Sequence, residues 1–155
     1  MAPYRLSPDD PRLDAVLALI RTSFAYMDGR VDPPSSMHRL DNAAVREQAR
    51  SGEVWAISDP PVACVFLSLS DDHLYLGKLA VSGSARRQGL ARRLFDLAEQ
   101  RARALGHDRI VLQSRIELAD NHAVFKAMGY EQVGTTAHPG YDRPTSYTFA
   151  KRVHG

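Results

Sequence analysis

Residues 74–91 read LYLGKLAVSGSARRQGLA, and this stretch decides the fold. Its first residues alternate in polarity and then run apolar, which predicts a β-strand over Leu74–Val81. A short turn of serine, glycine and arginine follows. From Gly89 to Leu105 the apolar residues recur at helical spacing, and Gly106 is suited to ending that helix. A strand, a tight turn and a long helix are therefore predicted in direct succession.

The turn between this strand and this helix has the features of an anion-binding site. The first N–H groups of a helix have no intrahelical partner, and the aligned peptide dipoles add about half a positive charge there. Gly89 lets the backbone approach a phosphate that a Cβ would block, and arginines in the turn add charge-assisted hydrogen bonds. The Lys-Ser/Thr pair of a P-loop and the three spaced glycines of a dinucleotide-binding turn are missing. The pattern predicts a phosphate or diphosphate site; its alternative is a helix start with a solvated basic face.

The remaining sequence predicts one α+β domain over residues 1–155, a length typical of a single core. Strands are expected over residues 4–6, 54–57, 62–69, 74–81, 109–113, 130–136 and 145–152. Helices are expected over residues 9–24, 42–50, 89–105 and 119–128. Asp9, Asp10 and Pro11 are expected to start the first helix, with an aspartate cap and an early proline. Gly77 interrupts its strand and predicts a β-bulge or a close approach by another backbone or a ligand.

Composition excludes several classes of function. The net charge of +2 is too small to indicate a nucleic-acid partner by itself. No stretch approaches the roughly 18 apolar residues of a membrane span, and the N-terminus lacks a signal core, so a cytoplasmic location is expected. Cys64 lies in an apolar run and is predicted to be a small buried hydrophobe. The six scattered histidines show no metal-ligand spacing, so no metal site is predicted. They are His38, His73, His107, His122, His138 and His154.

Two motifs give the chain a resemblance to a known family. Arg86, Gly89 and Ala91 match the pattern Gln/Arg-x-x-Gly-x-Gly/Ala. Asn121 precedes a short predicted helix that ends in Gly129 and a tyrosine, which is similar to a second segment of the same family. From residue 4 to residue 153 the chain thus resembles the GNAT superfamily of acyl-CoA-dependent N-acetyltransferases. The resemblance implies a mixed, mostly antiparallel central sheet of six to seven strands flanked by about four helices.

The resemblance also implies a ligand and the residues that hold it. Acetyl-CoA would be the co-substrate, with no metal. Its pantetheine arm would meet the strand end Leu79, Ala80 and Val81, and its pyrophosphate would lie on the turn and helix start. The residues of that turn and helix start are Arg86, Arg87, Gln88, Gly89, Leu90, Ala91 and Arg92. Asn121 and Phe125 would contact the cofactor from the last helix, although Phe125 reads equally well as a core residue.

The sequence departs from the family where protons are transferred. The tyrosine that many members place in the last helix is missing: one way of aligning the segment gives Phe125 and another gives Met128. Tyr141 or a water molecule would then protonate the departing thiolate. The strand before the cofactor turn has no carboxylate, so Glu117 is the predicted general base, with a capping or salt-bridge role as its alternative. His138, near Tyr141, is either a proton relay or a surface histidine.

These patterns predict transfer of an acetyl group from acetyl-CoA to a primary amine of a small molecule or peptide by direct attack. The alternative is a non-catalytic acyl-CoA sensor or interaction module, because the usual acid and base are missing. The irregular residues 27–38 are expected to wall the acceptor site, where Asp28 and Asp32 would favour an amine. No nucleic acid and no membrane are expected as partners. A homodimer, the acyl chain and the identity of the acceptor stay open.

Overall fold

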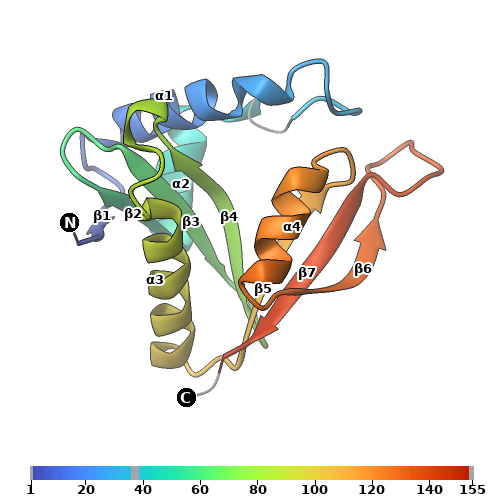
Figure 1. Ribbon diagram of the computed structural model, residues 1–155. Coiled ribbons are helices and arrows are strands. Elements are labelled where there is room, and N and C mark those ends of the chain that lie inside the picture. Colours follow the sequence, from blue (N-terminus) through green and yellow to red (C-terminus); the bar gives the residue numbers. More distant parts are fainter. Residues whose placement is uncertain (1, 36–38, 154–155) are drawn as a thin grey trace.

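The computed structural model describes residues 2–35 and 39–153, which form one sheet with helices on both faces (Figure 1). Across the sheet the strands follow the order β1-β2-β3-β4-β5-β7-β6. The strands are β1 Tyr4–Leu6, β2 Glu53–Ile57, β3 Ala63–Leu69, β4 Leu74–Val81, β5 Arg109–Arg115, β6 Glu131–Thr136 and β7 Ser146–Arg152. The helices are α1 Leu13–Phe24, α2 Asn42–Ser51, α3 Leu90–Ala104 and α4 Ala119–Ala127, with 3-10 turns η1 Ala25–Met27 and η3 Gly83–Ala85. Neighbouring strands are antiparallel except β4 and β5, which confirms the expected architecture.

Two apolar clusters hold the helices to opposite faces of the sheet. On one face α1 and α2 pack against alternate residues of the central strands, such as Cys64, Phe66 and Ala80. On the other face α3 buries the apolar stripe that its sequence predicted, and α4 packs beside it through Phe125. Because β3 is covered on both faces, its first five residues are all buried, as expected for a central strand. Cys64 is fully buried, which confirms the predicted packing role.

The start of α1 differs from the prediction. The helix begins at Leu13, and its N-terminal flanking residue is Arg12, whose side chain makes no capping hydrogen bond. Asp10 instead accepts a hydrogen bond from the Arg12 backbone N–H at 2.9 Å and pairs with the Arg12 guanidinium at 2.8 Å. Pro11 therefore lies in a turn before the helix. The cap prediction was wrong because this local turn satisfies the carboxylate before the helix starts.

Strand β4 carries the irregularity that Gly77 predicted. Phe66 of β3 pairs with Gly77, but two residues earlier in β3 Cys64 pairs with Ala80. Lys78 and Leu79 thus stand together opposite a single residue of β3, and Lys78 has a positive φ of 49°. This is a β-bulge, which bends the strand that carries it. The bend redirects the second half of β4.

A buried ion pair fixes α3 to the N-terminal half of the sheet. Glu53 at the start of β2 is 2 % exposed and receives two hydrogen bonds from Arg101 of α3, at 2.8 and 2.6 Å. The indole N–H of Trp55 donates to the same carboxylate at 2.7 Å. Burial alone would raise the pKa of Glu53, but these donors outweigh it, so the pKa lies below its usual value of 4.5.

Removal of the Arg101 guanidinium should therefore destabilise the protein. Arg101→Met should lower the free energy of unfolding by about 2 kcal/mol, because a buried carboxylate loses its charged partner. Arg103→Met, on the same helix, should change it by about 0.5 kcal/mol or less, because the Arg103 side chain is exposed and its ion pair with Glu99 is long, at 4.0 Å. Urea titrations measure both. The difference in unfolding free energy between the wild type and Arg101→Met should narrow as pH falls through the lowered pKa of Glu53, since protonation of Glu53 removes the same interaction from the wild type.

Candidate active site

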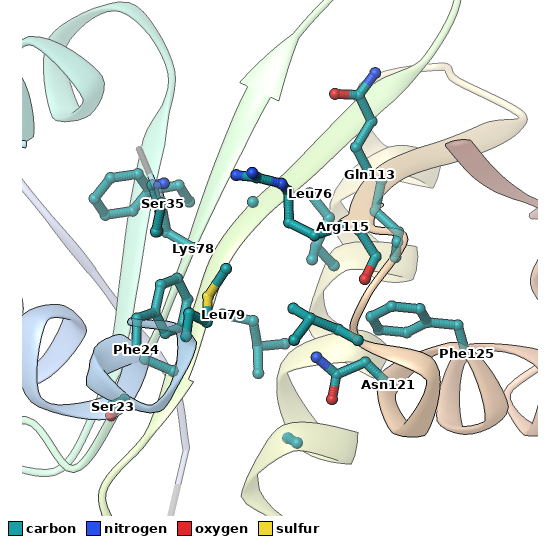
Figure 2. Close-up of a pocket in the computed structure, with 18 of the residues that line it drawn as sticks. Ser23, Phe24, Ser35, Leu76, Lys78, Leu79, Gln113, Arg115, Asn121 and Phe125 are labelled. Carbon is teal, nitrogen blue, oxygen red and sulfur yellow. The ribbon is translucent and has the colours of Figure 1, made fainter. Parts of the chain in front are cut away.

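A cavity of about 770 Å³ lies where β4 and β5 part (Figure 2). The two strands pair only at their starts, through Leu74 with Ile110 and Tyr75 with Val111. Beyond those pairs the bulged half of β4 follows β3, while β5 follows β7. Side chains from α1, η1, α2, β4, β5, α3, α4 and the connection between β6 and β7 line the space.

The start of α3 forms one end of this cavity. Gly89 has a left-handed φ of 74°, and a Cβ built on it would meet no atom within 4 Å. The Arg93 N–H is bonded to the Gly89 carbonyl oxygen at 3.1 Å, and the N–H groups of the turn before it precede the first intrahelical donor. Gly89 thus combines a backbone conformation that favours glycine with open space in front of it. Exposed donors and space of this kind suit a phosphate group.

The residues predicted to hold the cofactor fall into two groups. Those that line the cavity are Leu79, Ala80, Val81, Arg86, Ala91, Asn121 and Phe125. The others, Arg87, Gln88, Gly89, Leu90 and Arg92, belong to the adjoining turn and the first turn of α3. Among these, the side chain of Leu90 is buried in the core, so only its backbone could meet a ligand. The Val81 carbonyl oxygen already accepts a hydrogen bond from the Ser23 hydroxyl at 3.3 Å.

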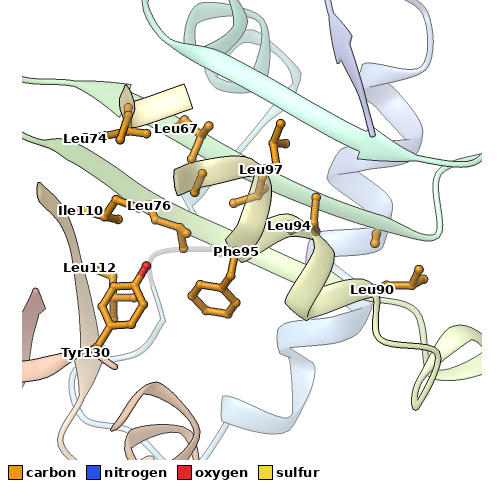
Figure 3. Close-up of a cluster of buried hydrophobic side chains, with 14 of the residues drawn as sticks. Leu67, Leu74, Leu76, Leu90, Leu94, Phe95, Leu97, Ile110, Leu112 and Tyr130 are labelled. Carbon is orange, nitrogen blue, oxygen red and sulfur yellow. The ribbon is translucent and has the colours of Figure 1, made fainter. Parts of the chain in front are cut away.

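Helix α4 supplies the wall opposite α1. Phe125 lines the cavity and also packs edge-on against Phe95 and at a tilt against Phe149, so it is a core residue, and its contact with a cofactor stays a prediction. Tyr130, which follows Gly129, is a core residue whose ring lies 5.7 Å from that of Phe95 (Figure 3). The second motif thus ends a helix and anchors it to the core.

The two residues predicted to move protons, Glu117 and Tyr141, lie outside the cavity lining. Both contact Asp32 in the segment between α1 and α2. A Glu117 carboxylate oxygen accepts a hydrogen bond from the Asp32 backbone N–H at 3.1 Å, and the Tyr141 hydroxyl donates to the Asp32 carboxylate at 2.7 Å. Arg143 binds the second Asp32 oxygen at 3.0 Å. The Asp32 carboxylate is thus already engaged, and a direct role for Glu117 or Tyr141 stays a prediction.

Four polar residues that line the cavity were either missed in the sequence or not predicted there as site residues. Tyr26, Lys78, Arg115 and His138 line it from η1, β4, β5 and the β6–β7 connection. The Tyr26 hydroxyl accepts a hydrogen bond from the Asn121 side chain at 3.3 Å. Only His138 carried a sequence signal, its place in a Pro/Gly-rich loop. The other three belong to no motif, and only the fold brings them together.

Burial and nearby cations lower two pKa values in this cavity. Burial lowers the pKa of Lys78, and Arg39 lowers it further. The pKa of His138 is lowered from 6.5, first by burial and then by Arg115 and Arg39. His138 is half-buried and directs Nδ1 to the Thr145 hydroxyl. A neutral imidazole at neutral pH is the consequence, and a neutral imidazole can accept a proton.

Other parts of the chain fit supporting roles. Burial raises the pKa of the Cys64 thiol to about 12, so it is not a nucleophile at neutral pH. Among residues 2–35 and 39–153, no three histidine, cysteine or acidic side chains gather in a way that could hold a metal ion. Within the same residues no helix is long and apolar enough to cross a bilayer. His38 and His154, with Ser36 and Met37, lie outside the described residues.

The sequence pattern of the Acetyltransferase (GNAT) family matches residues 13–130, which include β4, the predicted anion-binding turn, α3 and α4. The chain belongs to this family. No curated protein gives a significant sequence match. The sequence pattern thus establishes the family of this GNAT protein, and solved structures provide the structural comparison.

Solved structures share the fold over nearly the whole chain. An aminoglycoside 6'-acetyltransferase type Ii superposes with a TM-score of 0.77 at 20% identity, covering 100% of this chain and 99% of that one. Ard1 from Thermoplasma volcanium gives 0.76 at 18% identity, covering 99% and 98%. An aminoglycoside 6'-N-acetyltransferase complexed with coenzyme A gives 0.75 at 18% identity, covering 100% and 98%. At such identities the likeness establishes the fold and leaves the substrate open.

The backbone at Gly89 supplies a direct test of the anion site. Gly89→Ala should raise the Kd for CoA about 10-fold or more, because the added Cβ occupies the open space at the helix start. The residue has a positive φ, so the variant should also lose about 1 kcal/mol of stability.

Gly106→Ala is the matched control for this loss. Gly106 follows the other end of α3, has a φ of 80°, and also faces open space. It should show a similar fall in Tm and an unchanged Kd in calorimetry. Equal CoA affinity in the two variants would contradict a phosphate site at Gly89.

Proposed function

We propose that this protein transfers an acetyl group from acetyl-CoA to a primary amine by direct attack, without a covalent enzyme intermediate. One observation carries the proposal: a single cavity extends from Arg86 and Ala91 at the start of α3 to the unpaired edge of β4. Acetyl-CoA would supply an activated thioester. The chain's own contribution is to bind the phosphates at Gly89, to position the amine, and to move a proton.

The residues present fit such a ligand. The α3 start offers backbone donors together with Arg86, and Gly89 leaves room for close approach. The half of β4 beyond the bulge has no strand on its β5 side, so it offers backbone groups to an extended ligand. Leu79 and Phe125 line the space with apolar atoms between these regions. Low polarity beside aligned donors strengthens each hydrogen bond made there.

His138 is the group best placed to take the proton from the amine. It lines the cavity, and its lowered pKa leaves it neutral at neutral pH. Attack needs a neutral amine, so a neutral base within the cavity favours the reaction. Glu117 would act through the loop that it holds at Asp32.

His138→Gln should lower kcat about 100-fold near neutral pH, because it removes a general base while keeping a polar side chain. The pH profile gives the sharper measurement. Below the lowered pKa of His138, log(kcat/KM) of the wild type should fall about one unit more per pH unit than that of the variant. Parallel profiles in the two proteins would reject His138 as the base.

Two tyrosines can be compared as the donor that protonates the leaving thiolate. Tyr26 lines the cavity and is held by Asn121, whereas Tyr141 lies outside the lining and binds Asp32. Tyr26→Phe should lower kcat about 10-fold with little change in KM, since one positioned hydroxyl is lost. Tyr141→Phe should instead raise KM by loosening the loop at Asp32, and Glu117→Gln should resemble it. A larger fall in kcat for Tyr141→Phe or Glu117→Gln would restore those residues as catalytic groups.

A non-catalytic acyl-CoA-binding module is the second candidate. The observation in its favour is that no carboxylate occurs among the described residues that line the cavity. Thiol release measured with DTNB decides between the two. Turnover with any amine supports transfer, whereas thermal stabilisation by CoA without turnover across amines, amino acids and peptides supports the binding module.

A further inference from the structure

The charge of the cavity has a single sign. Its described lining residues include three basic side chains and a histidine but no aspartate or glutamate. The basic residues are Lys78, Arg86 and Arg115, and the histidine is His138. Arg86 belongs to the turn before α3. Lys78 and Arg115 instead come from β4 and β5, away from that turn.

Arg115 is a buried cation that makes no salt bridge among the described residues. It lies at the end of β5, is 8 % exposed, and donates through Nη2 to the neutral carbonyl oxygen of Pro33. Its Nε is buried and has no hydrogen-bond partner among the described residues. Burial lowers the pKa of Arg115 despite the opposing influence of Glu117, Tyr141 and Asp32. A guanidinium in this position retains the capacity to bind an anion.

The nearest acidic groups are only partly engaged elsewhere: the second oxygen of Glu117 is buried and has no hydrogen-bond partner among the described residues. One oxygen of Glu117 accepts the backbone N–H of Asp32, and both oxygens of Asp32 accept side-chain donors from Tyr141 and Arg143. These contacts hold the loop over the cavity. The charge of Glu117 offsets part of the charge of Arg115, but no salt bridge joins the two side chains, and the buried Nε of Arg115 retains its hydrogen for an anion in the cavity.

Lys78 adds a second positive charge from the facing strand. The bulge that gives Lys78 its positive φ also turns this residue into the cavity lining, where its Nζ lies 5.9 Å from the centre of the Phe24 ring. Figure 2 shows Lys78 and Arg115 on opposite sides of the space, carried by β4 and β5. An anion between them would feel both charges.

We propose that the acceptor carries a carboxylate as well as the amine, and that Arg115 binds this carboxylate while Lys78 strengthens the attraction. The proposal rests on acetyl transfer as the function and names its substrate class: amino acids and short peptides with a free carboxyl group. A guanidinium can bind a carboxylate through two parallel hydrogen bonds, which also orients the molecule. Polyamines and aminoglycosides carry several positive charges, and this cavity repels them.

The same charges would assist the reaction. Nearby cations disfavour the protonated form of an amine, so a bound acceptor loses its proton more readily in this cavity than in water. A carboxylate on the acceptor offsets the repulsion that an amine alone would meet. The positive charges of the cavity would thus both bind the carboxylate of the acceptor and favour the loss of a proton from its amine.

Matched acceptors test the proposal. Glycine is compared with glycinamide, and β-alanine with β-alaninamide, while putrescine and kanamycin serve as cationic amines. Thiol release gives kcat/KM for each. At least one acid should exceed its amide about 10- to 100-fold, the value of one hydrogen bond to a charged group. The cationic amines should be the poorest acceptors.

Arg115→Met should bring that ratio close to one, mainly by raising KM for the acid and not for the amide. Lys78→Met should lower the ratio several-fold, and it serves as the second variant if Arg115→Met does not fold. Arg50→Met is the control, because Arg50 is exposed on α2 and pairs with Glu47. It should keep the wild-type ratio. CoA affinity should be unchanged in all three, which separates acceptor recognition from cofactor binding.

The outcomes separate this inference from acetyl transfer itself. Equal turnover of acid and amide, or a ratio that survives in both Arg115→Met and Lys78→Met, would overturn carboxylate recognition and leave the transferase intact. If CoA binds but no acceptor reacts, the proposed function fails. Calorimetry of N-acetylglycine and N-acetylglycinamide against the CoA-bound protein then decides the carboxylate site. Tighter binding of the acid, lost in Arg115→Met, supports it, and equal or undetectable binding of the two rejects it.

Discussion

The divergence of β4 from β5 is the constraint on which the rest of this structure depends. Two residue pairs join these strands, after which the bulge at Lys78 and Leu79 bends β4 along β3. An unpaired strand edge inside a sheet is costly unless another group meets its N–H and C=O groups. Here the edge faces a cavity of about 770 Å³, and a ligand that pairs with the edge would complete the sheet. In the proposed function, ligand binding would thus use the backbone groups that pair in the rest of the sheet.

The two faces of the sheet give the two ends of the cavity different characters. On the α3 side, Leu90 and Phe95 fix the helix to the core, so its exposed N–H groups keep a constant position relative to β4. On the α1 side the wall is built from connections. Asp32 joins the segment after α1 to the end of β5 and to the β6–β7 connection, through Glu117 and Tyr141. One end is therefore set by apolar packing and the other by polar contacts, which are easier to rearrange around different acceptors.

In the proposed reaction, electrostatics would connect acceptor binding to reactivity. Transfer to an amine needs a neutral nucleophile, and a cavity that contains Lys78, Arg115 and a neutral His138 disfavours an ammonium ion. A carboxylate at the base position would have the opposite effect on the amine, since it would stabilise the charged form. The shortage of acidic groups among the described lining residues thus agrees with a chemical strategy as well as with a choice of acceptor. The stability of the fold depends on a different charged group, the buried carboxylate of Glu53, which accepts two hydrogen bonds from Arg101.

The sequence by itself determined the local elements and the anion-binding turn. Periodicity located β4 and α3, Gly77 indicated the bulge, and Gly89 marked a left-handed turn, because each feature depends on residues close together in the chain. Which polar groups line the cavity was decided only by the tertiary structure. Tyr26, Lys78, Arg115 and His138 come from four separate elements and carry no shared motif. Glu117 looked suitable from its place after a strand, but the fold engages it with Asp32. Sheet order and loop contacts decide which distant side chains share a cavity, and no local pattern encodes that neighbourhood.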